Sequence, residues 1–320
     1  MVKDELQWNF IKAMKAKIPQ RGRLAGILTE LLLIEKEAVY RRLRGEVPFS
    51  LNDVVIISRE LNISADEIFC NSSDKSRPFK MKMTEFCGME ESDYANIEQF
   101  LKDIEPLKSK AETEIGVAYN MIPQTLHLPY HNIYRFYLFK WTFHNCNPEN
   151  TKTFADVVPS QRLVKLNEKI VKTARETSNT CYIWDDKIFR NLVNDINYFT
   201  GIRLVSPEEV AVLKDEIMVF IDDIEHIAAR GSFDNGNKVQ FYVSSVSFES
   251  SSSYIEMPST VRTLMKSFTL NDVISSDEVV FRKTKAWINS LKRTSSMISE
   301  SGEIQRMRFF DQQREIVSKL

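Results

Sequence analysis

Glycine is scarce in this sequence, and the patterns that mark common enzyme sites are missing. Nine glycines occur in 320 residues, and neither GxGxxG, GxSxG nor HExxH is present. Loops that cradle phosphates depend on glycine, because its missing side chain lets the backbone approach the ligand. The acidic residues Asp222, Asp223 and Asp234 stand beside no such motif. We therefore expect a protein that is not an enzyme and needs no cofactor.

Cysteine pairs and long apolar runs are also lacking. No stretch approaches 18 consecutive apolar residues, and the opening MVKDELQWNF lacks the apolar core of a signal peptide. The four cysteines form no CxxC pair and no compact disulfide framework; they are Cys70, Cys87, Cys146 and Cys181. These absences predict reduced thiols in a cytoplasmic protein that has no membrane-spanning segment.

An excess of positive charge is missing as well. The chain carries 43 lysines and arginines against 44 aspartates and glutamates, for a net charge of −1. A protein that coats nucleic acid through its overall charge is thus excluded. Any binding of nucleic acid must come from a local basic surface.

The chain has enough apolar residues for two cores, at 43% of its length. A boundary between them is indicated by CNSSDKSRPFK at residues 70–80, which is polar, contains proline and has no hydrophobic periodicity. We predict a helical domain over residues 1–70, a linker over 71–90 and a larger domain over 91–320. The predicted fold class is mainly α.

Apolar residues at helical spacing recur throughout the larger domain. They predict helices near 94–104, 130–144, 161–175, 184–199, 206–230, 276–293 and 303–319. The clearest begins at Ser206, where Pro207 suits the first helical position and Glu209 completes a capping box. Gly231 is a stop signal for the same helix.

A different period marks the region after that helix. Val239, Phe241 and Val243 alternate with polar residues, which predicts a β-hairpin over 238–257 with its loop at Ser250 to Ser253. A third strand is expected near 266–270. The sequence thus predicts a small antiparallel β-sheet set among helices.

The first domain contains the segment that indicates function. Helices are predicted over residues 4–18, 24–32, 35–43, 51–61 and 65–69. Ser50 and Asp53 suit the start of the helix over 51–61 as N-cap and capping-box partner. Helices this short need a shared core, and Val39 and Leu43 are expected to point into it. The opposite face of the helix over 35–43 would then be exposed; it holds Lys36, Glu37, Tyr40, Arg41 and Arg44.

That exposed face has the chemistry of a DNA-binding surface. An α-helix fits the major groove of B-DNA, and an arginine can pair with guanine O6 and N7. Lys36, Glu37 and Tyr40 lie toward the amino end of the helix, which suits contact with base edges. Arg42 and Arg44 suit phosphates. Arg21 and Arg23, just before the preceding helix, are expected to hold the adjacent strand.

The same segment resembles the lambda-repressor-like (XRE-type) helix-turn-helix family. The resemblance rests on Leu28, Ile34, Val39, Gly45, the stretch from Pro48 to Leu51, the stretch Leu61-Asn62-Ile63-Ser64, and the ending from Asp66 to Phe69. It covers about 50 residues. It implies a five-helix domain whose third helix, Glu35 to Arg44, reads the major groove. Lys36, Glu37, Tyr40 and Arg41 fall on the base-facing positions by this resemblance.

Two positions differ from the family pattern. The family usually has a small residue at the place of Thr29 and a glycine at the place of Leu33. A leucine in a left-handed turn costs about 1–2 kcal/mol. A turn of another geometry is therefore an open alternative at this position.

Several features allow a second interpretation. The arginines of the exposed face can pair with Glu37 and Glu46 as an ordinary solvated surface. His127, His131 and His144 with Cys146 suggest a zinc site, although packing is the favoured interpretation. The aromatic run 130–143 can line a pocket or fill a core, and the seam from Val210 to Ile227 can pack internally or form a coiled coil. Core packing is favoured for both.

Together these features predict a transcriptional regulator with an N-terminal five-helix helix-turn-helix domain, followed by a larger, mostly helical domain. The larger domain would mediate dimerisation, signal sensing or both. The expected partners are double-stranded DNA, a second copy of the chain, and an unidentified small-molecule or protein effector. The alternatives are a protein-interaction module that uses the same helices without DNA, and an enzyme fused to a DNA-binding domain.

Overall fold

The computed structural model describes residues 2–61, 63, 81–83, 90–108, 112–145, 152–268 and 270–320. The chain divides into two compact units, Met1–Phe79 and Lys80–Leu320. The predicted helix over 65–69, most of the predicted linker over 71–90, and Cys70, Cys87 and Cys146 lie outside the described residues. Cys181 is a free, buried thiol.

The smaller unit is helical, as predicted. Its described helices are α1 (Val2–Lys17), α2 (Arg21–Leu32), α3 (Lys36–Leu43) and α4 (Leu51–Glu60). α2, α3 and α4 are too short to be stable alone, and all four helices contribute to one buried core. That core consists of Phe10, Ile11, Met14, Leu24, Ala25, Leu28, Val39, Leu43, Ile57 and Ile63. The prediction that Val39 and Leu43 point into it is confirmed.

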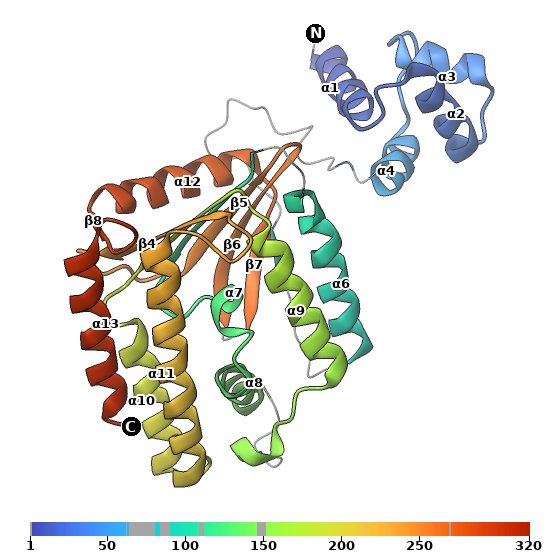
Figure 1. The fold of residues 1–320 in the computed structure, drawn as a ribbon. Helices are drawn as coiled ribbons and strands as arrows, with labels where there is room; N and C mark the ends of the chain where they lie inside the picture. Colours follow the sequence, from blue (N-terminus) through green and yellow to red (C-terminus); the bar gives the residue numbers. More distant parts are fainter. Residues whose placement is uncertain are drawn as a thin grey trace. The chain divides into compact units, whose positions relative to one another are not determined.

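The fold class predicted for the larger unit is wrong. Instead of a small antiparallel sheet, its described residues form one eight-stranded mixed sheet (Figure 1) in the order β1-β7-β6-β5-β2-β3-β4-β8. The strands are β1 (Met81–Met83), β2 (Glu114–Tyr119), β3 (Asn179–Trp184), β4 (Lys238–Ser244), β5 (Ser252–Met257), β6 (Thr260–Phe268), β7 (Asn271–Ser275) and β8 (Ser295–Met297). β3 is parallel to both β2 and β4, and the remaining neighbours are antiparallel. The unit is therefore of mixed α and β class.

The hairpin predicted over 238–257 is also wrong. β4 pairs with β3 and β8, whereas β5 pairs with β2 and β6. β2 and β3 thus lie between the two strands that the sequence pattern had joined. The tight turn is instead at Pro258-Ser259, since Met257 and Thr260 pair across it. Alternation identifies a strand but carries no information on which strand lies beside it.

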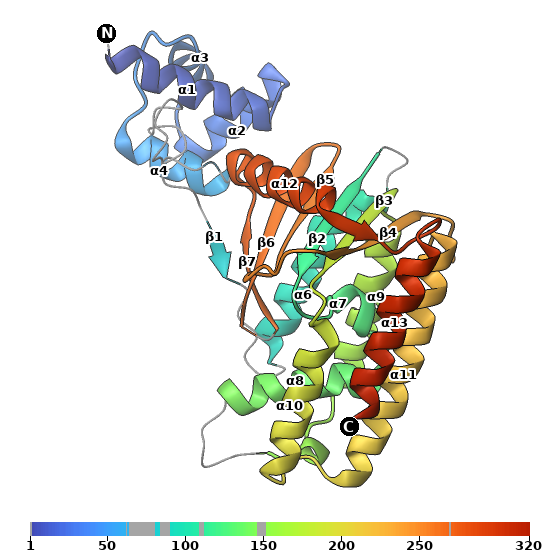
Figure 2. The same ribbon diagram turned by 90° about the vertical axis from the view of Figure 1, so that its left-hand side faces the viewer.

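Helices cover both faces of the sheet. They are α6 (Glu91–Ile104), α7 (Gln124–His127), α8 (His131–Asn145), α9 (Gln161–Arg175), α10 (Ile188–Gly201), α11 (Pro207–Arg230), α12 (Glu278–Arg293) and α13 (Glu303–Ser318), with short 3-10 helices η1 (Glu105–Lys108) and η3 (Phe154–Asp156). Among them α12 packs on one face, and the others gather on the opposite face (Figures 1 and 2). Helices join β2 to β3 and β3 to β4. They carry the chain back to the same edge of the sheet, so that consecutive strands run parallel.

Most predicted helices of this unit are confirmed. Those near 94–104, 130–144, 161–175, 206–230, 276–293 and 303–319 correspond to α6, α8, α9, α11, α12 and α13. The helix predicted over 184–199 starts later, at Ile188, because Trp184 ends β3. α11 has the predicted capping box between Ser206 and Glu209, and Gly231 follows it with φ 70°.

Both ambiguous helices pack into the core, and Tyr134 of α8 also lines a cavity there. In α11 the seam residues Leu213, Ile217, Phe220 and Ile224 are buried within the unit. In α8 the aromatic residues fill the main core between the sheet and the surrounding helices. No described helix combines the length and apolar content that crossing a bilayer requires.

The three histidines considered for zinc lie in different environments. His127 is fully buried and stacks on Tyr137, with ring centroids 4.4 Å apart. Burial lowers the pKa of His127 to about 3, so its ring is neutral. His131 and His144 are exposed. The described residues contain no group of three metal-ligating side chains.

A close contact at the centre of the sheet yields the first prediction. A Cβ added to Gly116 in β2 would lie 2.5 Å from Cζ of Tyr254, whose buried ring is held by Glu114 and Phe281. Gly116→Ala should therefore lower the free energy of unfolding of the larger unit by about 1–3 kcal/mol. Urea unfolding followed by near-UV circular dichroism measures this change.

A second glycine provides the matched control. Gly201 ends α10 with nothing within 4 Å of an added Cβ. Gly201→Ala should leave stability unchanged or raise it slightly, since alanine restricts the unfolded chain. Equal stability of the two variants would contradict close packing between β2 and Tyr254.

Candidate nucleic-acid interface

The helix-turn-helix consists of α2, a three-residue turn and α3. α2 ends at Leu32 and α3 begins at Lys36. Leu33 turns the chain with φ 51° and ψ 41°, in the left-handed region, and its side chain is 90% exposed. The turn geometry is thus the one that glycine would adopt, even though leucine occupies the position. Because the Leu33 side chain is exposed, it has no packing energy that could offset the strain of its backbone.

α3 is oriented by the residues that it buries. Val39 and Leu43 enter the core of the smaller unit, and the side chains of Lys36, Glu37, Arg41 and Arg44 are exposed. This agrees with the predicted exposed face, with one correction: Tyr40 is only partly exposed and packs against the core. Tyr40 follows Val39 directly, so it lies at the border of the buried stripe.

Arg42 also differs from its predicted place. It was expected to reach phosphates, but its side chain is partly buried beside α4. Its Nε lies 3.6 Å from Oδ2 of Asp53, and Nη1 donates to the carbonyl oxygen of Ala38. Asp53 in turn accepts from the backbone N–H of Ser50 in the predicted capping box. Arg42 therefore links α3 to the start of α4.

The carboxyl end of α3 holds a cluster of charges. Arg44 Nε donates to Oε1 of Glu46 at 2.5 Å, and Nη2 donates to Oε1 of Glu37 at 3.0 Å. Glu46 also lies 3.6 Å from Nε of Arg41. The hydrogen bond from Arg44 lowers the pKa of Glu46, which keeps this carboxylate ionised. The alternative in which these arginines pair with Glu37 and Glu46 thus describes the contacts of the unit without DNA.

Both helices of the motif begin without a side-chain cap. Gln20 before α2 and Glu35 before α3 accept no backbone hydrogen bond through their side chains, in contrast to Ser50 before α4. The first N–H groups of a helix have no partner within it, and they bind anions well. Arg23, in the first turn of α2, is exposed; the side chain of Arg21 is outside the described part of the chain. The start of α2 can thus accept a phosphate.

The sequence interpretation assigned no role to the basic residues of α1. Lys12, Lys15 and Lys17 are exposed, and Lys15 lies 5.9 Å from the ring centroid of Trp8. Residues 2–61 contain eleven lysines and arginines against eight aspartates and glutamates. The spacing of these lysines along the first predicted helix is the sequence feature that could have indicated a basic surface there. The smaller unit is therefore modestly basic within a chain that is nearly neutral.

The left-handed turn yields the second prediction. Replacing Leu33 with glycine should stabilise the smaller unit by about 0.5–1 kcal/mol, because the relief of backbone strain exceeds the entropy gained by the unfolded chain. Amide hydrogen exchange in α2 and α3 measures this. Glu30→Gly, at an exposed position in the last turn of α2, is the control and should destabilise the unit by about 1 kcal/mol. A destabilised Leu33→Gly protein would contradict the turn described here.

Comparison with known protein families finds a similarity, and it includes the helix-turn-helix. A family model described as BetR domain matches residues 11–99, and this is a helix-turn-helix-type family of DNA-binding domains. The match begins within α1, includes α2 to α4, and ends within α6. No curated protein and no solved structure matches the chain. Residues 11–99 are thus similar to the BetR domain family, and this segment includes the helix-turn-helix formed by α2 and α3.

Proposed function

We propose that the protein is a sequence-specific transcriptional regulator that inserts α3 into the major groove of its operator. The observation that supports this most is the coincidence of the BetR match with an exposed, cationic α3 oriented by buried Val39 and Leu43. We further propose that the motif is of the lambda-repressor-like (XRE) type, because its three-residue turn and short α3 have the form that this type requires.

The contacts of the proposed complex follow from the exposed side chains. Lys36, Glu37 and Arg41 contact base edges, and Tyr40 adds the part of its ring that is exposed. Arg44 exchanges its two carboxylate partners for phosphate oxygens at the edge of the groove. Arg21, Arg23 and the uncapped N–H groups of α2 hold the neighbouring phosphates. Arg42 keeps its place beside Asp53 and positions α3.

In this proposal the larger unit mediates dimerisation and binds the effector. A single helix-turn-helix domain buries little DNA surface, so two domains on one operator multiply the affinity. We propose a homodimer on that ground. An effector that binds the larger unit would then act on two DNA-binding domains together.

A double substitution tests the role of α3. Arg41→Ala with Arg44→Ala should weaken operator binding by at least about tenfold and make it less dependent on salt, because fewer counterions are released. Fluorescence anisotropy with labelled duplex at several salt concentrations measures both. Far-UV circular dichroism should not change, since both side chains are exposed.

The matched control removes positive charge elsewhere in the same unit. Lys12→Ala with Lys17→Ala in α1 deletes two exposed cations that the proposal does not place in the groove, and it should reduce affinity less. Full DNA binding by the folded Arg41/Arg44 variant would overturn the role of α3. A larger loss in the α1 variant would assign the interface to α1 instead.

Selection from a random pool of duplex DNA tests sequence specificity and the dimer together. The bound sequences should contain two inverted half-sites with centres about 10 base pairs apart, or a multiple of this. A single unpaired half-site would contradict the dimer. No enrichment, together with no gel shift on generic duplex at low salt, would contradict DNA binding and favour the protein-interaction module.

A further inference from the structure

The larger unit contains a cavity of about 220 Å³ between its sheet and helices α6 and α9. Its walls are mostly apolar; they include Ile97, Phe100, Leu163, Ile115, Ile255 and Ile274. A second hollow on the surface shares Leu128, Arg175 and Phe233 with this cavity. These three residues therefore stand between the interior and the solvent, and they mark a route of entry.

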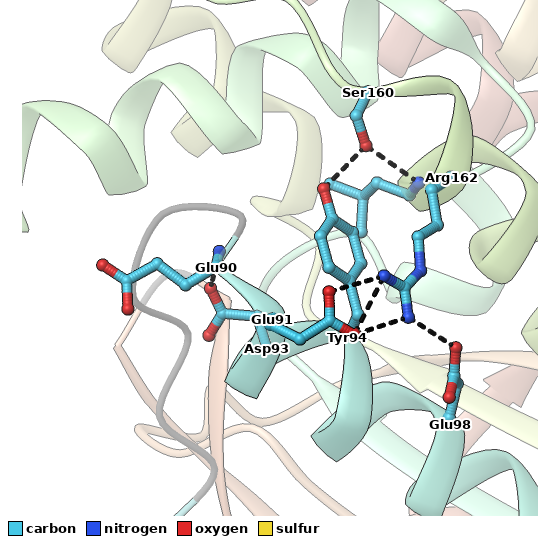
Figure 3. Close-up of polar contacts among 8 residues, drawn as sticks. Glu90, Glu91, Asp93, Tyr94, Glu98, Ser160 and Arg162 are labelled. Carbon is cyan, nitrogen blue, oxygen red and sulfur yellow. Dashed lines mark hydrogen bonds and ion pairs between the residues drawn. The ribbon is translucent and has the colours of Figure 1, made fainter.

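The two helices over the cavity are joined at the amino end of each (Figure 3). Tyr94 of α6 and Ser160 before α9 share a hydrogen bond of 2.8 Å. Arg162 pairs with Glu91 and Glu98 at 2.8 and 3.0 Å, and its guanidinium lies 4.3 Å from the Tyr94 ring centroid. Hydrogen bonds from Arg162 lower the pKa of Glu91. These contacts thus hold α6 and α9 together over the cavity.

Several polar groups in the walls have partners of their own. The hydroxyls of Tyr182 and Thr125 lie 2.9 Å apart, and Lys266 pairs with Asp272 at 3.0 Å. The capping carboxylate of Asp93 accepts from the backbone N–H of Glu90. These groups need no ligand to satisfy them.

Two side chains in the walls have a buried donor nitrogen with no hydrogen bond of normal geometry. Asn167 is only 6% exposed; its Nδ2 faces the hydroxyl of Tyr134 but makes no hydrogen bond of normal geometry, so at least one of its two N–H groups has no acceptor. Nε of Arg175 is likewise buried and unpartnered. No ion pair of Arg175 is found within the described residues, and its guanidinium lies over the ring of Phe233 at 5.3 Å. A buried donor left without an acceptor is costly, and more so when it is charged.

We propose that this cavity binds an apolar monocarboxylate that carries a second acceptor oxygen. The carboxylate pairs with Arg175 at the entry, the apolar body lies against the isoleucines, and the second oxygen accepts from Asn167. The two residues are eight positions apart on α9, or about 12 Å along its axis, and the long arginine side chain shortens that gap. One carboxylate therefore does not serve both donors.

Size limits the ligand. A cavity of ~150 Å³ holds benzene, which by proportion gives roughly nine heavy atoms for this one. Among the described lining residues Arg175 is the one cation, and the carboxylates of Asp93 and Asp272 are also present. The cavity therefore does not suit a nucleotide or another polyanion, since further negative charges would be buried without a cation. Heptanoate, 7-hydroxyheptanoate and 1-heptanol are thus suitable probes that differ only in their oxygens.

A regulatory step rests on the proposed function. Asp93, Asn96 and Ile97 line the cavity from α6, and they belong to the segment matched by the BetR family model. A ligand in the cavity therefore contacts the same stretch of chain that contains the helix-turn-helix. We expect occupancy to change the affinity for operator DNA.

Isothermal titration calorimetry of the full chain tests the ligand class without DNA. Heptanoate should bind about 10- to 100-fold more tightly than 1-heptanol, and 7-hydroxyheptanoate should bind about fivefold more tightly than heptanoate. Arg175→Gln should remove the preference for the carboxylate, and Asn167→Leu the preference for the hydroxyl. The control Arg293→Gln, an exposed position on α12, should change neither.

A variant that fills the cavity provides a test that does not depend on the folding of the polar variants. Ala174→Leu adds apolar volume at the cavity wall and keeps both donors, so it should abolish binding and leave the thermal midpoint equal or higher. Equal binding of heptanol and heptanoate, unchanged heptanoate binding by Arg175→Gln, or no binding of any carboxylate would each overturn the proposal.

Anisotropy with operator DNA then separates this proposal from the proposed function. Saturating ligand should change DNA affinity in the wild type and not in Arg175→Gln. Ligand binding with unchanged DNA affinity would overturn the regulatory step alone. Ligand binding by a chain that binds no DNA would overturn the proposed function and leave the cavity assignment standing.

Discussion

The parallel pairing of β2 with β3 is the constraint on which the larger unit depends. Both strands lie in the middle of the sheet, and successive residues such as Val117 and Ala118 enter separate cores on its two faces. Strands buried on both faces must be covered on both faces. Helices therefore pack on either side of the sheet, with α12 on one side and α6 and α9, which roof the cavity, on the other.

A simpler constraint acts in the smaller unit. Burial of Val39 and Leu43 orients α3 and leaves its opposite side exposed. Two apolar residues four positions apart lie on the same side of a helix, so one buried pair decides the direction of every other side chain on it. The placement of Tyr40 at the border of the buried stripe follows from the same geometry.

Three arginines show how the surroundings decide the role of one residue type. Arg44 is shared between Glu37 and Glu46 on the surface, and Arg162 joins α6 to α9 through Glu91 and Glu98. Arg175 lines a cavity and has no carboxylate partner among the described residues. The sequence singled out Arg44 alone, whereas Arg162 and Arg175 lie on a predicted helix with no pattern that distinguishes them. Only their neighbours in space make them a surface cluster, a structural link and a ligand site.

Features that depend on neighbours a few positions away can be predicted from the sequence. The helices, the capping boxes at Ser50 and Ser206, and the inward face of α3 all follow from such local patterns. The sheet order, the position of Arg42 beside Asp53, and the cavity depend instead on contacts between distant segments. β2 pairs with β5, and α6 packs on α9, across long stretches of chain. Central strands lose the alternation of half-buried ones, and a cavity arises only where distant segments meet.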